Sequence, residues 1–104
     1  MQHIALRDET AELTTTWTSY AVGRIGATYL KIMRMDELPV GDDVHADPEA
    51  LLVVDGRLEM TVDGEDVSVG PGELLIVPGH AVHSIRPGSH GTLFLVNLNP
   101  PDAA

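Results

Sequence analysis

Short runs in which apolar and polar positions alternate predict β-strands along most of the chain. Residues 57–62 alternate in this way, and the Asp63-Gly64 pair that follows is a strong signal for a tight hairpin turn into residues 65–69. Residues 27–35 form another predicted strand, one face of which carries Tyr29, Lys31, Met33 and Met35. Such a face either lines a pocket or belongs to the ordinary core.

Further strands are predicted where aliphatic, β-branched or aromatic residues cluster between turn signals. They cover residues 14–20, 51–54, 74–77, 83–86 and 92–98. Glycine, proline and aspartate predict turns near residues 23–26 and at 55–56, 70–72, 78–79 and 87–88. Residues 1–13 fit either an edge strand or a short helical turn. Many short strands without a helical period indicate an all-β protein, a sandwich or barrel, for which a small jelly roll is the natural candidate.

Length and charge restrict the partners of this chain. Its 104 residues fit one domain, residues 1–104. The formal net charge of -10 argues against nucleic acid or an anionic membrane, because both require clustered lysine and arginine. A small-molecule ligand or substrate remains open. No secretory signal and no apolar run of membrane-spanning length is visible, so a cytoplasmic location is expected.

The chain has no cysteine, so any metal must be held by histidine, aspartate or glutamate. Two stretches, residues 41–56 and 72–83, are rich in these residue types. In an extended strand Asp43 and His45 point to the same face, and Glu49 can rejoin that face after the kink at Asp47-Pro48. Imidazole and carboxylate groups on one interior face indicate a metal site.

The same two stretches resemble the two motifs of the cupin superfamily. The first motif is matched by the second of its two histidines, its glutamate and its closing glycine, at His45, Glu49 and Gly56. The second is matched by its glycine, proline and histidine, at Gly72, Pro78 and His83. The resemblance covers roughly residues 27–98 and implies a small β-barrel, the double-stranded β-helix or jelly roll of single-domain cupins.

Three positions depart from the family pattern. Asp43 stands where the first motif has its first histidine, His80 stands where the second motif has a glycine, and Pro87 stands where an asparagine often follows. Asp43 is therefore either a fourth ligand or a solvated rim residue. His80 is a solvated loop residue in one interpretation, and in the other it supports a metal ligand or transfers a proton.

The resemblance implies that His45, Glu49 and His83, with Asp43 as a fourth candidate, hold a divalent metal ion inside the barrel. Two imidazoles and a carboxylate suit Fe, Mn, Ni or Zn, and the sequence does not distinguish among them. The first functional hypothesis is a metal-dependent enzyme of the dioxygenase, isomerase or decarboxylase kind. The alternative is a non-catalytic cupin that binds or senses a small molecule, with a structural metal or none. No catalytic residue can be named.

Small cupins usually pair as homodimers. The resemblance therefore implies a homodimer here, with residues 1–26 as extension strands that take part in the pairing.

Overall fold

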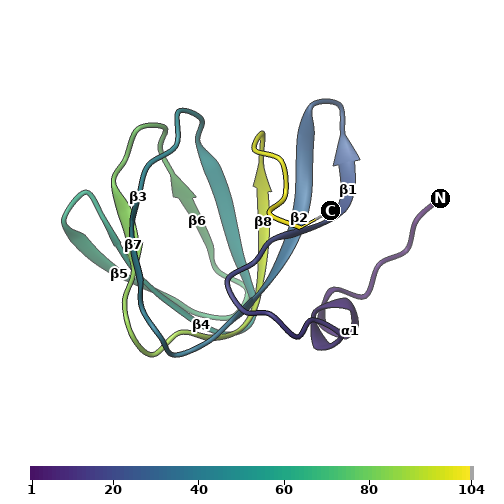
Figure 1. Cartoon of the computed structure of the whole chain (residues 1–104), viewed down its shortest axis with the longest axis horizontal. Helices are drawn as coiled ribbons and strands as arrows, with labels where there is room; N and C mark the ends of the chain where they lie inside the picture. The colour runs from purple at the N-terminus through teal and green to yellow at the C-terminus, as the bar shows by residue number, and fades with distance from the viewer. Residues whose placement is uncertain (104) are drawn as a thin grey trace.

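The computed structural model describes residues 1–103, which form a small β-barrel with one short helix (Figure 1). The helix is α1 (Leu6–Ala11). The strands, in chain order, are β1 (Tyr20–Ile25), β2 (Thr28–Met35), β3 (Val40–Asp43), β4 (Glu49–Val62), β5 (Glu65–Val69), β6 (Leu74–Val77), β7 (His83–Ile85) and β8 (His90–Asn97). This arrangement confirms the predicted all-β barrel of the jelly-roll kind.

The strands belong to two antiparallel sheets that share one long strand. The first sheet has the order β1-β2-β8-β4-β6, and the second has the order β3-β7-β4-β5. The first half of β4 pairs with β6 and β8, and its second half pairs with β5 and β7. Because β4 passes from one sheet into the other, it joins the two walls of the barrel (Figure 1).

The core lies between the two sheets, and buried and more exposed residues alternate within each half of β4. Along β4, Leu51, Val53, Leu58 and Met60 are buried, and the residues between them are more exposed. Strand β8 contributes Leu93 and Leu95 to the same core. A period of two therefore identifies the inward face of both strands.

Several predicted strands and turns are confirmed. Strand β2 covers the alternating segment, and β4 and β5 form the hairpin at Asp63-Gly64. Both turn residues have positive φ, 47° and 79°, as a tight hairpin of this kind requires. Residues 1–13, for which strand and helix were both open, contain α1.

The strand predicted at residues 14–20 is wrong, because β1 begins only at Tyr20. The side chains of Thr16 and Trp17 donate hydrogen bonds to the carboxylate of Asp36, and Trp17 has a φ of 55°. These contacts hold the segment in an irregular path. Gly23 lies inside β1 at a register shift, so the turn is confined to residues 26–27.

The turn predicted at Asp55-Gly56 is also wrong, because β4 continues through it with a bulge. Gly56 has a φ of 81° and faces Gly91 of β8, which has a φ of 97°. A Cβ on Gly56 would lie 2.0 Å from the carbonyl oxygen of His90. The glycine pair therefore permits a close crossing of β4 and β8 where β4 leaves the first sheet.

No helix in residues 1–103 has the length and apolar character needed to cross a membrane.

Candidate metal centre

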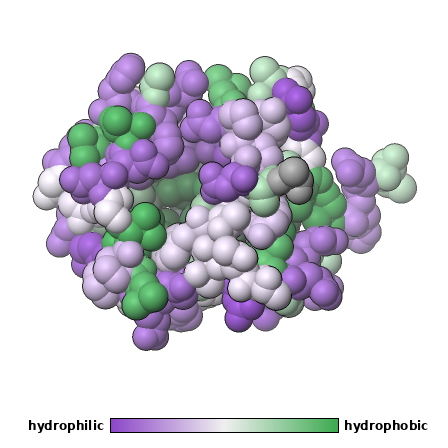
Figure 2. Space-filling model, viewed as in Figure 1, coloured by the Kyte–Doolittle hydropathy of each residue, from purple (hydrophilic) through white to green (hydrophobic). Residues whose placement is uncertain are grey.

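A cavity of about 210 Å³ lies inside the barrel, between the two sheets. Its apolar wall consists mainly of core side chains, among them Met33, Leu51, Met60, Leu93 and Leu95. On the face shown in Figure 2 the surface is hollowed near its middle, and the floor of the hollow is hydrophobic. The volume is smaller than that of a site for a drug-sized ligand, so the cavity suits a small molecule.

Pairing of β3 with β7 brings three predicted site residues together at this cavity. Asp43 is the cross-strand partner of His83, and His45 follows two residues after Asp43 in the loop that leaves β3. Donor atoms of Asp43, His45 and His83 all lie within 4.8 Å of one another. Nε2 of His45 is 3.5 Å from Oδ2 of Asp43, and the two imidazole rings are 5.1 Å apart at their centroids. In the described part of the chain this is the only such group of three or more.

The buried imidazole of His83 has one ring nitrogen engaged and the other directed at a carboxylate. Its Nδ1 lies 3.1 Å from the carbonyl oxygen of Ala81, which can only accept a hydrogen bond, so the proton of the neutral ring belongs on Nδ1. The lone pair of Nε2 then faces Oε1 of Glu49 at 3.6 Å, which is too long for a hydrogen bond. This tautomer leaves Nε2 available to a ligand.

Glu49, the first residue of β4, is buried beside His83, outside the group of three whose donors meet within 4.8 Å. Its Oε2 accepts a hydrogen bond of 3.0 Å from the side-chain amide of Asn97, on β8. Asn97 therefore fixes one carboxylate oxygen and leaves Oε1 directed at His83. Asp43, by contrast, lies at the rim, with a side chain that is 62% exposed.

The turn after β6 holds the loop that carries His45. The backbone N–H of His80 donates a hydrogen bond of 2.7 Å to the carbonyl oxygen of His45. Gly79 lies so close to this loop that a Cβ would meet the carbonyl oxygen of Ala46 at 2.4 Å. The side chain of His80 is exposed, so its contact with the site is made by the backbone.

Sequence reasoning missed a polar chain that leads from the metal candidates to Lys31. Asn97 donates to Glu49 and accepts from the backbone N–H of Asn99 at 3.1 Å, and the carbonyl of Asn99 accepts from Nζ of Lys31 at 3.0 Å. Burial lowers the pKa of Lys31, against the raising effect of the charges on Asp102 and Glu49. The alternation of β2 already placed Lys31 on one face with two methionines. A lysine on a face with apolar residues was the signal in the sequence that it lies inside the barrel.

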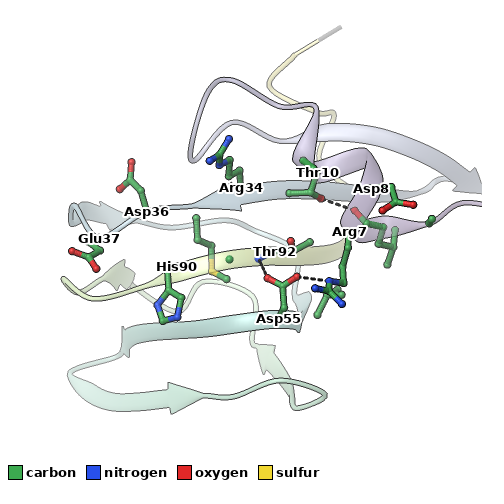
Figure 3. A pocket seen from close by; sticks show the side chains of 15 residues that line it. Arg7, Asp8, Thr10, Arg34, Asp36, Glu37, Asp55, His90 and Thr92 are labelled. Atoms are coloured by element: carbon green, nitrogen blue, oxygen red, sulfur yellow. Dashed lines mark hydrogen bonds and ion pairs between the residues drawn. The ribbon is translucent and has the colours of Figure 1, made fainter.

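A second, more open hollow lies on the outside of the barrel, between α1 and strands β2, β4 and β8 (Figure 3). Asp55 lines this hollow, forms an ion pair of 3.0 Å with Arg7 of the helix and accepts a hydrogen bond of 3.0 Å from the backbone N–H of Thr92. These contacts attach the N-terminal helix to the barrel. The hollow contains no group of metal-binding side chains in the described residues.

Comparison with known proteins decides the family. The family model for the cupin domain matches residues 35–98, which is more than half of the chain. This chain belongs to the cupin family. The matched segment contains both motifs and every candidate metal ligand of this cupin.

Solved structures agree with the cupin fold. A cupin-2 domain protein from Shewanella frigidimarina superimposes with a TM-score of 0.82 at 16% identity, over 90% of this chain and 92% of that one. A protein from Neisseria meningitidis gives 0.82 at 22% identity, over 94% and 100%. A Rhizobium leguminosarum protein of unknown function gives 0.73 at 26% identity, over 92% and 93%. A search of curated proteins found no significant match.

Proposed function

We propose that this cupin holds a divalent metal ion through His45, His83, Glu49 and Asp43 and acts as a metal-dependent enzyme on a small molecule in the adjoining cavity. One observation carries the proposal. Donor atoms of two histidines and one aspartate, from β3, the following loop and β7, converge within 4.8 Å at a cavity inside the barrel.

The residues present fit such an ion. The tautomer favoured by the bond from Nδ1 of His83 to Ala81 leaves a lone pair on Nε2, and a backbone acceptor behind a histidine ligand is the usual arrangement at metal sites. Two donors about 2.1 Å from a metal lie about 3–3.4 Å apart. Nε2 of His45 lies 3.5 Å from Oδ2 of Asp43, and Nε2 of His83 lies 3.6 Å from Oε1 of Glu49, so each pair is close to that spacing. Glu49 lies outside the group of three and would move closer to Asp43 and His45 to share one ion with them.

When bound, the metal would supply a Lewis acid that polarises a carbonyl or enolate oxygen of the substrate, or a centre at which oxygen is activated. The imidazoles and carboxylates suit Fe, Mn, Ni or Zn. The chain itself would orient the ligands: Ala81 sets the tautomer of His83, Asn97 sets the carboxylate of Glu49, and His80 holds the His45 loop through its backbone.

Metal content tests the proposal directly. The protein is purified without a histidine tag, loaded with each candidate metal in turn, and measured by elemental analysis. We expect about one metal ion per chain in the wild type and its loss in His83→Ala and His45→Ala. His90→Ala, which removes an exposed histidine outside the metal group, should retain the metal. A wild-type protein without stoichiometric metal after every loading would refute the proposal.

Metal binding should weaken as the pH falls. Imidazole and carboxylate bind a metal only when deprotonated, so protons compete with the ion for the same atoms. Equilibrium dialysis at a series of pH values measures the retained metal. Full retention at acidic pH, where imidazoles are protonated in solution, would count against the assigned ligands.

The alternative function is a cupin that binds or senses a small molecule without reaction. A second measurement distinguishes it from the enzyme. The metal-loaded protein is incubated with small carbonyl and carboxylate compounds, and oxygen uptake and product formation are followed. Turnover that disappears in His83→Ala supports the enzyme. Ligand binding without turnover across the panel supports the binding protein.

A further inference from the structure

Lys31 is the only lysine in the chain, and it lies inside the barrel. Apart from histidine, the other basic side chains are five arginines, and none of these arginines lines the cavity. Lys31 is 4% exposed, although lysine is among the residues least often buried unless it is paired. A residue type that normally lies on the surface is here confined to one interior position.

The ammonium group of Lys31 has unused donor capacity. It carries three N–H groups, and in the described structure its one hydrogen bond runs to the neutral carbonyl of Asn99. No carboxylate of residues 1–103 lies within ion-pair distance of Nζ, and Asp102 and Glu49 act on it only at longer range. Burial accordingly lowers the pKa of Lys31, which shows that these distant charges do not offset its desolvation.

Lys31 lines the same cavity as the candidate metal ligands. Lys31 pairs with Leu95 on the inward face of the first sheet, and both side chains line the cavity. The hydrogen-bonded chain through Asn99 and Asn97 ends at Glu49, so Lys31 and this candidate metal ligand belong to one continuous polar wall. Asp102 and two serines also line the cavity, and the remaining lining is largely apolar. A small molecule in the cavity therefore contacts this wall with its polar groups.

We propose that the cavity takes a small carboxylate, and that Lys31 is the residue that selects it by donating hydrogen bonds from its ammonium group to the carboxylate oxygens. The inference rests on the proposed function in one respect, since it takes the cavity to be the ligand site beside the metal. Charge-assisted hydrogen bonds of this kind are the strong ones in proteins, and they would be made where water is largely excluded.

Binding of matched pairs tests the proposal. Each pair consists of a carboxylate and its uncharged amide of nearly the same shape: acetate and acetamide, lactate and lactamide, butyrate and butyramide. Calorimetry measures their affinities for the zinc-loaded wild type and for Lys31→Gln, which retains a donor for Asn99 without the charge. At least one carboxylate should bind the wild type about tenfold or more tightly than its amide. In Lys31→Gln this preference for the carboxylate over the amide should disappear. Lys31→Met, similar in length and apolar, provides a second variant if Lys31→Gln fails to fold.

The single lysine supplies an independent measurement. With isotope-labelled lysine the protein gives one set of lysine side-chain NMR signals, and the signal of the carbon next to Nζ should move on addition of the preferred carboxylate and stay in place with its amide. A wild type that prefers no carboxylate, or a preference unchanged in Lys31→Gln, would overturn the proposal. Metal content is measured on the same samples. If the protein carries no metal, the proposed function fails, and the response of the Lys31 signal still decides the role of Lys31.

Discussion

His80 occupies the left-handed region of the backbone, at a φ of 65°, in the turn that holds the His45 loop. The family motif places a glycine at this position. The structure gives the reason, because any residue with a Cβ is strained at this positive φ. The exposed imidazole makes no side-chain hydrogen bond in the described residues. The side chain of His80 therefore adds strain to the turn without adding a contact to the site.

His80→Gly should stabilise the protein. Relief of left-handed strain, about 1–2 kcal/mol, exceeds the entropy that glycine adds to the unfolded chain, so the free energy of unfolding should rise by about 0.5–1 kcal/mol. Urea unfolding measures the change. His80→Ala removes the same imidazole and keeps the strain, so it should not stabilise. Equal stabilisation by both substitutions would show that the side chain, and not the backbone, is responsible.

Asp36 organises the segment before β1. Its carboxylate accepts hydrogen bonds from the hydroxyl of Thr16, the backbone N–H of Leu38 and the indole N–H of Trp17, and these bonds lower the pKa of Asp36 below 3.8. A carboxyl with a lowered pKa stabilises the fold above its unfolded pKa, and the contribution is lost as the pH falls through the folded value.

Asp36→Asn should therefore lower the melting temperature at neutral pH, and the difference from the wild type should shrink as the pH falls below about 4. Thermal unfolding across a pH series measures it. Glu37→Gln, the neighbouring exposed carboxylate without a side-chain hydrogen bond in the described residues, is the control and should change little. A constant difference at all pH values would contradict the role given to the ionised carboxylate.

Strand β4 connects the two sheets, and its passage depends on the glycine crossing with β8. The alternation of its second half was readable from the sequence, because Leu58 and Met60 recur at every second residue after the bulge. The bulge was not readable, because a glycine with positive φ serves a turn and a bulge equally well. The strand predicted at 14–20 failed for a related reason: β-propensity does not reveal that Asp36, distant in sequence, binds Thr16 and Trp17.

Gly56→Ala should destabilise the barrel by about 2–5 kcal/mol, from the strain of positive φ together with overlap against the backbone of β8. Gly64→Ala is a matched control, because its φ of 79° is similar and nothing lies within 4 Å of the added Cβ. The control should cost only about 1–2 kcal/mol. Equal losses in urea unfolding would show that the close crossing makes no contribution.

The candidate site was predictable to the extent that it follows the two motifs. Asp43, His45 and His83 come together because β3 pairs with β7, although the sequence pattern predicted no strand at residues 40–43. Lys31 and Asn97 could not be assigned to the site in advance. Asn97 binds Glu49 directly, whereas the link from Lys31 runs through the backbone of Asn99, after the last strand, and only the folded chain brings that residue to β2.

At the scale of the whole molecule, the outer face of the first sheet carries apolar side chains. Leu74 and Ile76 of β6 are 60% and 57% exposed, and the registers place them beside Leu52 and Ala50 of β4, which in turn lie beside Phe94 and Val96 of β8. Apolar residues continuous over three strands are typical of a surface that another protein covers. We propose that the homodimer implied by the cupin resemblance forms over this face. Strand β1 pairs with β2 of its own chain.

Light scattering should report a dimer at micromolar concentration. Ile76→Lys, which places a charge in the middle of this face, should shift the protein towards monomers. Val82→Lys, at an exposed apolar residue in a loop outside the sheet, should leave the mass unchanged. A monomeric wild type would remove the expectation, and a dimer unaffected by Ile76→Lys would place the contact elsewhere, such as along residues 1–26.

Because Lys31 is buried, its chemical modification measures how readily small molecules reach the interior of the barrel. An amine-directed acylating reagent finds the single lysine side chain of this sequence inside the barrel. The rate of its modification, followed by mass spectrometry, records how often the barrel admits a molecule of the reagent's size. Reagents of increasing size would then measure the width of the entrance, and a compound seated inside would slow the reaction.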